Sequence, residues 1–410
     1  MKVCIPNFAR EVLCRLQENG FEAWAVGGCV RDTLLDRIPQ DWDVTTSALP
    51  EEIKRCFEEY RVIETGIAHG TVTVISGGKP VEVTTYRVDG TYSDGRHPDF
   101  VTFTRSLHED LARRDFTVNA MAFCEQEGLR DDFGGQEDIV RRTIRCVGSP
   151  QRRFHEDALR ILRALRFAST LMFSVEADTA AAVRSCAGTL RTIAVERILA
   201  EWNKLLCGSG AEEVLCAFPQ VFKVFLEELR PLLENPAAWR RAVARVCSAP
   251  REKHLRTALL FRAVPGLGAA EQAEIAKRAL RRLHAENKMI LRVCALIETE
   301  LPYSAELPEI RRLLGRNGEE LFSAQLALLR AEGREDVAAA DQMKQEILAR
   351  GDCIRLSQLA LKGSDLSGEG KETGMLLNAA LDAVIRDRVP NKKAELLQYL
   401  KQRSADKMEQ

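Results

Sequence analysis

The sequence of 410 residues lacks several features that mark particular classes of protein. It has no run of about 18 apolar residues, so we expect no membrane span. Its first ten residues lack the charged, then apolar, then small-residue pattern of a signal peptide. Hydrophobic residues make up 45% of the chain and charged residues 29%, which excludes disorder or a collagen-like sequence for the whole chain. These absences predict a globular protein located in the cytoplasm.

The 12 cysteines do not form the clusters that disulfide scaffolds or zinc sites require. They are scattered from Cys4 to Cys353, and no C-x-x-C pair occurs. Zinc sites need several ligands at short spacings, so we expect no zinc. Most of the cysteines, such as Cys124 and Cys294, stand among apolar neighbours. We therefore expect reduced thiols that pack as small apolar side chains.

The chain also lacks a net charge of one sign, because 59 Lys and Arg are balanced by 60 Asp and Glu. The charges are unevenly distributed along it. Residues 141–166 contain eight arginines against two acidic residues, and residues 240–292 contain thirteen Lys or Arg against four Glu. A local basic excess fits a surface that follows a nucleic-acid backbone, and it fits solvated helix faces equally well. Charge alone leaves both interpretations open.

The pattern of apolar residues changes near residue 140. Before it, a helix is expected over 30–35 and another from 116 to 123. Apolar and β-branched runs predict strands at 21–26, 41–45, 71–75, 81–86 and 101–104. After it, helical periodicity covers 156–169, 177–186, 195–206, 237–247 and 271–300, with a glycine-rich break at 363–374. The sequence thus predicts an α+β head with a small mixed sheet, followed by an elongated, all-α body and tail.

Two glycines, Gly27 and Gly28, stand between a predicted strand and a predicted helix. Glycine lets the backbone approach a ligand closely, and the first N–H groups of a helix bind anions well. Together with Arg31, these groups suit a triphosphate. A Gly-Gly turn taken alone is more often only a structural turn.

Nine residues after Asp32, the sequence Asp41-Trp42-Asp43 places two carboxylates two residues apart. On a strand, such residues point to the same face, so we expect both to project together while Trp42 and Val44 face the core. Neighbouring carboxylates repel each other unless a cation such as Mg²⁺ neutralises them. With a phosphate site upstream, the pair predicts a two-metal centre for phosphoryl or nucleotidyl transfer. The alternative is a surface loop that carries two acids.

Five motifs in order give the chain a resemblance to a known family. The first, from Gly27 through Asp32 to Asp41 and Asp43, resembles the opening motif of nucleotidyltransferases related to DNA polymerase β. More narrowly, it resembles the class II tRNA nucleotidyltransferases, which include the CCA-adding enzymes and bacterial poly(A) polymerases. The later motifs are R-R-D-F-T-V-N-A at 113–120, D-F-G-G at 132–135 with Asp138, E-D-A-L-R at 156–160 and E-R-I at 196–198. Residues 361–391 resemble the family's tail more loosely.

The resemblance implies a function and a division of the chain. The function is template-independent addition of C, C and A to the 3′ end of tRNA from CTP and ATP, with release of diphosphate and with Mg²⁺ on Asp41 and Asp43. No membrane and no protein partner is implied. The expected parts are a polymerase β-like catalytic head at 1–140, a nucleotide-recognising helical neck at 141–207, and a tRNA-binding helical body at 208–345 and tail at 346–410.

The fourth motif allows base choice to be argued from chemistry. If residues 156–169 form one helix, Asp157 and Arg160 are neighbours on it. Cytosine and adenine both present an amino donor beside a ring-nitrogen acceptor, which matches a carboxylate acceptor and a guanidinium donor. Uracil and guanine reverse this pattern. The pair would therefore select C and A without a template, with each good bidentate contact worth ~1–3 kcal/mol.

Further residues are expected around the nucleotide because of the resemblance. The nucleotide-binding set is Gly28, Arg31, Arg114, Asp157, Arg160, Arg163 and Arg166, and the supporting set is Gly27, Asp32 and Glu156. For Arg166 an ordinary ion pair on a helix is the alternative. Glu82, on the predicted strand 81–86, is a weaker candidate for a third carboxylate.

The polar segment 87–98 and the basic helices are expected to act on the RNA. In the resembled family a loop at 87–98 is needed for the final A, and enzymes that add only CC have it shortened. Here it is full length, which favours complete CCA synthesis, although His97 replaces the usual Arg. Phosphate contacts are expected from residues 240–292 and from Lys362, Arg386, Arg388, Lys392 and Lys393.

Other functions fit part of these observations. A bacterial poly(A) polymerase is nearest, but its basic G-R-R-F-like signature is replaced here by T-G-I-A-H-G-T-V-T-V at 65–74. Enzymes that add only CC or only A share the motifs. A small-molecule nucleotidyltransferase needs no long helical body, and the absence of an adjacent His-Asp dyad argues against an added phosphohydrolase domain. A non-catalytic RNA-binding protein has no reason to keep the repulsive pair Asp41 and Asp43.

Overall fold

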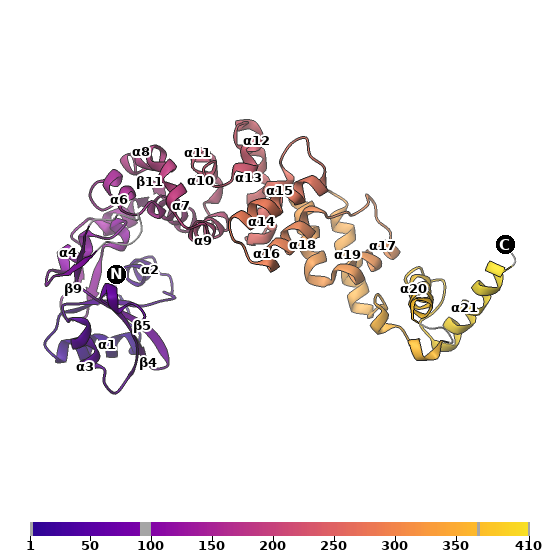
Figure 1. The fold of residues 1–410 in the computed structure, drawn as a ribbon, viewed down its shortest axis with the longest axis horizontal. Coiled ribbons are helices and arrows are strands. Elements are labelled where there is room, and N and C mark those ends of the chain that lie inside the picture. The colour runs from indigo at the N-terminus through magenta and orange to yellow at the C-terminus, as the bar shows by residue number, and fades with distance from the viewer. Residues whose placement is uncertain (1–2, 91–99, 367–369, 409–410) are drawn as a thin grey trace. The chain divides into compact units, whose positions relative to one another are not determined.

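The computed structural model describes residues 3–90, 100–366 and 370–408 of the chain (Figure 1). The chain divides into two compact units. One consists of Met1–Arg240 with Ala279–Ala285, and the other of Arg241–Arg278 with Glu286–Gln410. In the part of the chain that the structure describes, no helix has the length and apolar character needed to cross a membrane. The division into four parts at 140, 207 and 345 stays a prediction.

A mixed sheet of seven strands forms the centre of the first unit, as predicted for an α+β head. The strand order is β3-β4-β5-β2-β1-β8-β9, with β2 and β5 parallel and the other neighbours antiparallel. These strands are β1 (Ala23–Val26), β2 (Asp43–Thr46), β3 (Arg61–Ile63), β4 (Thr71–Ser76), β5 (Lys79–Thr85), β8 (Ala122–Cys124) and β9 (Gly128–Arg130). Two separate pairs are β6 (Arg87–Asp89) with β7 (Val101–Phe103) and β10 (Thr143–Ile144) with β11 (Ser174–Val175).

Helices cover this sheet and make up nearly all the remaining regular structure (Figure 1). Before residue 207 they are α1 (Asn7–Glu18), α2 (Gly28–Leu34), α3 (Pro50–Cys56), α4 (Leu107–Ala112), α5 (Gly135–Val140), α6 (Pro150–Glu156), α7 (Leu159–Leu171), α8 (Ala177–Cys186) and α9 (Val195–Leu206). After it they are α10 (Ala211–Ala217), α11 (Pro219–Phe222), α12 (Arg230–Leu233), α13 (Pro236–Ser248), α14 (Lys253–Arg262), α15 (Ala269–Arg282), α16 (Asn287–Ile297), α17 (Leu307–Asn317), α18 (Glu319–Ala331), α19 (Val337–Arg350), α20 (Lys371–Ile385) and α21 (Lys393–Met408). The predicted helical body and tail are confirmed.

Strand alternation decides which side chains of β2 reach the site. In the antiparallel pair β1–β2, Val26 is opposite Asp43 and Trp24 is opposite Thr45. Directly opposed residues lie on the same face of a sheet. Trp24 and Val26 pack in a buried cluster with Leu111 of α4. Asp43 and Thr45 therefore share the face that α4 covers.

Several expected elements differ from the structure. The helix expected at 116–123 is wrong, because a single 3₁₀ turn, Thr117–Asn119, leads directly into strand β8. The helix expected at 271–300 is interrupted between α15 and α16, where His284 has a positive φ of 52°. The short strands β10 and β11 were not predicted, because two residues are too few for an alternation pattern.

The helix expected at 156–169 is two helices. α6 ends at Glu156, and Asp157 adopts an extended backbone with φ −140° and ψ 105°. Its carboxylate accepts a hydrogen bond from the backbone N–H of Leu159, at 2.9 Å. Asp favours such local bonds over the helical conformation, so it ends one helix and starts the next. Apolar periodicity continued through the break and did not indicate it.

Helices α7 and α9 pack closely where the chain leaves α9. The hydroxyl of Ser169 on α7 donates to the carbonyl of Leu205, at 2.6 Å. The backbone N–H of Gly210 donates to the Ser169 carbonyl, at 2.8 Å. Between them, Gly208 faces the backbone of α7 without a side chain to separate the two segments.

We expect Gly208→Ala to destabilise the first unit. An added Cβ would lie 2.7 Å from the carbonyl carbon of Ser169 and closer still to its hydroxyl, so the backbone must move. Overpacking of this kind costs ~1–3 kcal/mol in free energy of unfolding. Gly188→Ala is the matched control, since no atom lies within 4 Å of its added Cβ. Denaturant unfolding compares the two, and equal stability would contradict the packing described.

Candidate active site

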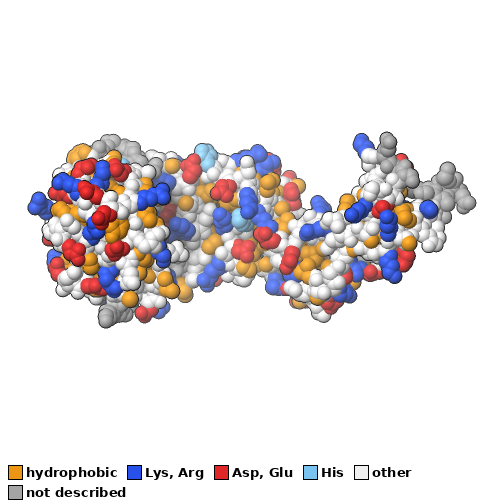
Figure 2. Space-filling view, turned by 90° about the horizontal axis from the view of Figure 1, so that it is seen from below, with side chains coloured by type: hydrophobic (Ala, Val, Ile, Leu, Met, Phe, Trp, Pro, Cys, Tyr) orange, Lys and Arg blue, Asp and Glu red, His pale blue; other side chains and the backbone are white. Residues whose placement is uncertain are grey.

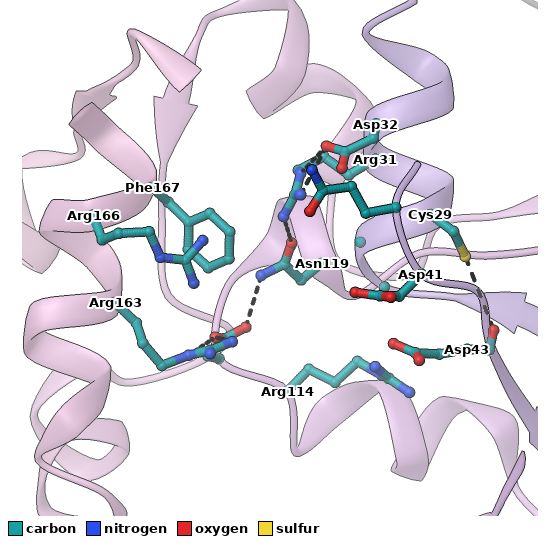
Figure 3. A pocket seen from close by; sticks show the side chains of 14 residues that line it. Cys29, Arg31, Asp32, Asp41, Asp43, Arg114, Asn119, Arg163, Arg166 and Phe167 are labelled. Carbon is teal, nitrogen blue, oxygen red and sulfur yellow. Dashed lines mark hydrogen bonds and ion pairs between the residues drawn. The ribbon is translucent and has the colours of Figure 1, made fainter. Parts of the chain in front are cut away.

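One pocket in the first unit collects most of the site residues predicted from the sequence (Figure 3). Its volume is about 370 Å³. It is lined by Gly27, Gly28, Cys29, Arg31, Asp32, Gln40, Asp41, Asp43, Arg114, Asp115, Asn119, Arg163, Arg166 and Phe167. The predicted residues Glu156, Asp157 and Arg160 do not line it.

The carboxylates of Asp41 and Asp43 lie side by side in this pocket (Figure 3). Asp43 is the first residue of β2, whereas Asp41 precedes the strand, which therefore begins two residues later than expected. Trp42 and Val44 are buried, as the alternation predicted. The two acids share one side of the chain even though only one of them belongs to the strand.

The environment of Asp43 disfavours its ionised form. Burial raises the pKa of Asp43 to about 6, and the carboxylate of Glu82 adds to this effect. Glu82 is the neighbour of Asp43 in the parallel pairing of β2 with β5. Arg114 acts in the opposite direction and Asp41 raises the pKa further. A divalent cation bound between the acids would remove this repulsion, so the oxygen donors present fit a hard metal ion.

The candidate metal site rests on Asp41 and Asp43. Within residues 3–90, 100–366 and 370–408, no cluster of three or more His, Cys, Asp or Glu side chains is arranged to hold a metal ion. Glu82 stays a candidate third ligand and does not line the pocket. Cys29 does line it, but burial raises the pKa of its thiol to about 11, so it is a protonated side chain at neutral pH.

The glycine turn makes room for an arginine. Gly27 has φ 78° and ψ −128°, a conformation that suits glycine, and it immediately precedes α2. A Cβ on Gly27 would lie 3.3 Å from Nη1 of Arg114. The missing side chain thus lets this guanidinium lie over the turn, close to Asp43 (Figure 3).

Every arginine that lines the pocket is paired with a carboxylate. The ion pairs are Arg31 with Asp32 at 2.7 Å, Arg114 with Asp110 at 3.2 Å, Arg163 with Asp115 at 2.6 Å and Arg166 with Glu201 at 2.8 Å. A guanidinium paired in this way is held in one orientation and loses less freedom when it binds an anion. The ordinary ion pair considered for Arg166 is therefore present, although the residue also faces the pocket.

Asn119 joins two of these pairs into one network. Its Oδ1 accepts a hydrogen bond from Arg31 at 2.6 Å, and its Nδ2 donates to Asp115 at 3.0 Å. Burial raises the pKa of Asp115, but the guanidinium of Arg163 and the amide of Asn119 outweigh it and hold this pKa well below its usual range. Hydrogen bonds thus connect α2 to α7 across the pocket, as the dashed lines in Figure 3 mark.

Sequence reasoning missed Asp110, whose side chain is fully buried. It accepts hydrogen bonds from Arg113, Arg114 and the hydroxyl of Thr45, at 2.8, 3.2 and 3.1 Å. It therefore links α4 and Arg114 to the strand that carries Asp43. Arg113 and Arg114 follow Asp110 at spacings of three and four residues. Such spacings are typical of ion pairs on a helix, so the sequence did contain a signal for this contact.

Asp157 and Arg160 are not paired with each other. The carboxylate of Asp157 forms an ion pair with Arg197 at 3.1 Å, in addition to its bond to Leu159. Arg160 forms an ion pair with Glu156 at 2.7 Å. The expectation that both side chains project from one helix is therefore wrong, because the helix break at Asp157 turns its carboxylate toward α9. Their part in base choice stays a prediction.

The arginine excess at 141–166 is largely neutralised by ion pairs. Seven of its eight arginines pair with carboxylates at 4 Å or less: Arg141, Arg145, Arg152, Arg153, Arg160, Arg163 and Arg166. On the face shown in Figure 2, Lys and Arg are interspersed with Asp and Glu rather than gathered apart from them. Counting charges over 141–166 overestimated the unpaired basic charge, because four of the partners, Glu137, Asp138, Asp115 and Glu201, lie outside that window.

We expect Asp110→Asn to lower the free energy of unfolding by about 3 kcal/mol or more, because it leaves Arg114 without its buried counter-ion and Arg113 with only the longer pair to Asp89, at 3.8 Å. Asp132→Asn is the control, since Asp132 pairs with the more exposed His108 and Arg130. Loss of such surface pairs costs at most about 1 kcal/mol. Equal losses in denaturant unfolding would show that Asp110 is not the anchor described.

Two protein-family models match the chain. The Poly A polymerase head domain matches residues 23–145, and the model described as "Probable RNA and SrmB- binding site of polymerase A" matches residues 172–218. The first match contains the sheet, Asp41, Asp43 and Arg114. The second begins after α7.

Known proteins are similar over nearly the whole chain. The CCA-adding enzyme of Geobacillus thermodenitrificans is 39% identical over 408 residues, which covers 96% of each chain. The crystal structure of the Bacillus stearothermophilus CCA-adding enzyme in complex with CTP is 31% identical, covers 98% of each chain and has a TM-score of 0.80. A tRNA nucleotidyltransferase complexed with a primer tRNA and an incoming ATP analog is 25% identical, covers 83% of this chain and 99% of its own, and has a TM-score of 0.63. Identity of this degree over the full length shows that the chain belongs to the CCA-adding enzyme family of tRNA nucleotidyltransferases.

Proposed function

We propose that this chain adds C, C and A to the 3′ end of tRNA, using CTP and ATP and releasing diphosphate. The observation that carries the proposal is the pocket, in which two adjacent carboxylates face four arginines. Carboxylates suit divalent cations, and convergent arginines suit a triphosphate, so one pocket provides for both partners of nucleotidyl transfer. The similarity to CCA-adding enzymes over 96% of the chain identifies the reaction.

Asp41 and Asp43 are the proposed catalytic and metal-binding residues. Mg²⁺ is the proposed ion; it would lower the pKa of the attacking 3′-hydroxyl and neutralise charge on the transferred phosphate. Arg114, Arg163 and Arg166 hold the triphosphate, with Gly28 and Arg31 at the start of α2 in supporting contact. The 3′-oxygen of tRNA attacks the α-phosphorus of the nucleotide, and the bond to the diphosphate breaks.

Asp157 and Arg160 are the proposed base-reading residues, with Glu156 holding Arg160. An ionised carboxylate has about four acceptor positions. The bonds of Asp157 to Leu159 and Arg197 therefore leave it able to accept an amino hydrogen of cytosine or adenine. Asp157 can therefore act as the acceptor in the selection of C and A, although it and Arg160 do not project from one helix as expected from the sequence.

The helical parts are proposed to hold the tRNA. Candidate phosphate contacts include Arg388 and residues 240–292, while Lys393 forms an ion pair with Asp365. The division into head, neck, body and tail at 140, 207 and 345 is part of this proposal. The proposed location is the cytoplasm, which suits cysteines that form no disulfide among the described residues.

Complete CCA synthesis is proposed rather than addition of CC or A alone. The segment that bears on this choice includes 91–99 and His97, which lie outside the described residues. The strands β6 and β7 flank this segment and pair antiparallel. The support therefore comes from its length in the sequence.

The test of this function is extension of tRNA that lacks its 3′ CCA, with Mg²⁺ and with CTP, ATP or both, resolved at single nucleotides. We expect two additions with CTP and one further addition with ATP.

Asp41→Ala should abolish extension while leaving tRNA binding within about twofold of wild type, because it removes a proposed metal ligand. Asp36→Asn, an exposed neighbour outside the pocket lining, is the control and should extend normally.

Any other pattern of products would contradict one part of the proposal. Long A tracts would support a poly(A) polymerase, and a stop at CC or addition of A alone would show a partial enzyme. Tight tRNA binding without extension would support a non-catalytic RNA-binding protein. Normal turnover by Asp41→Ala would remove that residue from the metal site.

Base choice is tested by Asp157→Ala. Loss of the acceptor should raise incorporation of UTP relative to CTP by roughly 5- to 150-fold, which corresponds to ~1–3 kcal/mol of discrimination. The change also removes the hydrogen bond that Asp157 accepts at the start of α7. Glu176→Ala is therefore the control, because it removes similar hydrogen bonds at the start of α8 without touching a proposed base-reading residue. The carboxylate of Glu176 accepts hydrogen bonds from two N–H groups in the first turn of α8, at 3.0 and 2.8 Å. Unchanged exclusion of UTP by Asp157→Ala would contradict the base-reading role.

A further inference from the structure

Three arginines of the pocket surround one aromatic ring, that of Phe167. The guanidinium carbon of Arg166 lies 3.4 Å from the ring centroid, that of Arg31 4.8 Å and that of Arg163 5.5 Å. A guanidinium within ~6 Å of an aromatic centroid is attracted to the negative face of the ring. Figure 3 shows Phe167 on the side of the pocket where Arg166 and Arg163 enter from α7.

The ring is itself held in place. Phe167 is only 4% exposed, although it lines the pocket. Its ring meets that of Phe116 edge to face, with centroids 5.8 Å apart and planes at 78°. This geometry is favourable for a pair of aromatic rings. A rigid ring of this kind gives the three cations a fixed surface to pack on.

The arginines need such a surface because like charges repel. Asp32, Asp115 and Glu201 neutralise the three guanidinium groups, but they do so by accepting hydrogen bonds from N–H donors in the guanidinium plane. The ring attracts the cation through its face and takes no N–H donor. The remaining in-plane donors stay available for phosphate oxygens.

We propose that Phe167 is a positioning residue for the nucleotide triphosphate: its ring holds Arg31, Arg163 and Arg166 together on one side of the pocket before the nucleotide binds. The inference rests on the proposed function. Phe167 acts through the arginines and touches no reacting atom, so its effect is on nucleotide binding rather than on the chemical step. The effect increases with the number of phosphates on the ligand.

The test replaces the ring and measures binding of CTP, CDP and CMP by calorimetry, together with KM and kcat in the extension assay. Phe167→Leu should weaken CTP binding and raise KM for CTP and ATP roughly tenfold, within the range of cation–π contributions. CDP should be affected less than CTP, and CMP least. kcat should stay within about threefold of wild type, and Phe167→Tyr, which keeps the ring, should restore CTP affinity.

Phe57→Leu is the matched control. Phe57 is buried away from the pocket, its ring meets that of Tyr60 edge to face with centroids 5.4 Å apart, and among the described residues no arginine lies over its ring. It should lose a similar amount of thermal stability while binding CTP within about twofold of wild type, because it contributes packing without a cation contact. If leucine at 167 unfolds the chain, Phe167→Met keeps most of the volume without the ring and is used instead.

Three results would overturn the inference. The first is a CTP affinity of Phe167→Leu equal to that of Phe57→Leu. The second is an equal loss of affinity for CTP and CMP, and the third is no recovery of CTP affinity in Phe167→Tyr. The first two would show only a packing effect, and the third would show that the ring face is not what matters. A wild-type chain that binds CTP but extends no tRNA would reject the proposed function and leave the binding comparison valid.

Discussion

Four arginines converge on one pocket because each is held by a carboxylate, and the rest of the site depends on this pairing. Three of the four partners, Asp110, Asp115 and Glu201, come from α4, from the segment after it, and from α9, and the fourth, Asp32, is next to Arg31 in α2. A folded first unit is therefore needed to assemble them. Without these carboxylates, the arginines would repel one another, and their side chains would have to be ordered by the ligand at a cost in affinity.

Two kinds of acidic residue lie close together here and have opposite electrostatic environments. The pKa of Asp43 is raised to about 6 by burial and by nearby carboxylates, with only Arg114 opposing. The pKa of Asp110 and that of Asp115 are lowered, because their arginines outweigh the effect of burial. The first environment suits acids that bind a cation, and the second suits acids that position cations. Nucleotidyl transfer needs both, since a metal ion and a triphosphate meet at the reacting phosphate.

The residues that the sequence could identify are those whose role follows from local spacing. Gly27, Gly28, Asp41 and Asp43 occur within seventeen consecutive residues, and the structure brings all four to one pocket. Strand alternation identified β1, β2, β4 and β5 of the mixed sheet but not the short strands β3, β8 and β9, whereas helical periodicity was sufficient for the helical body. A family resemblance then connected these residues to a reaction.

What the sequence could not show depends on contacts between distant segments. In the sequence, Phe167 is indistinguishable from an apolar core residue of a helix. Its proposed role in positioning arginines depends on the folded structure, in which Arg31, 136 residues away, lies over its ring. The ion pair of Arg166 with Glu201 is likewise long-range. Asp157 was placed in a helix because apolar periodicity continues past it, whereas its side chain ends α6. Periodicity reports which face is buried and does not detect a single residue whose side chain bonds to its own backbone.

A crystal structure of the chain with CTP bound tests most directly whether the paired arginines form the triphosphate site. We expect triphosphate oxygens within hydrogen-bonding distance of Arg114, Arg163 and Arg166, while each arginine keeps its carboxylate: Asp110, Asp115 and Glu201. A triphosphate bound elsewhere, or arginines that leave these carboxylates to reach it, would contradict the claim that the pairs hold the pocket ready for the nucleotide.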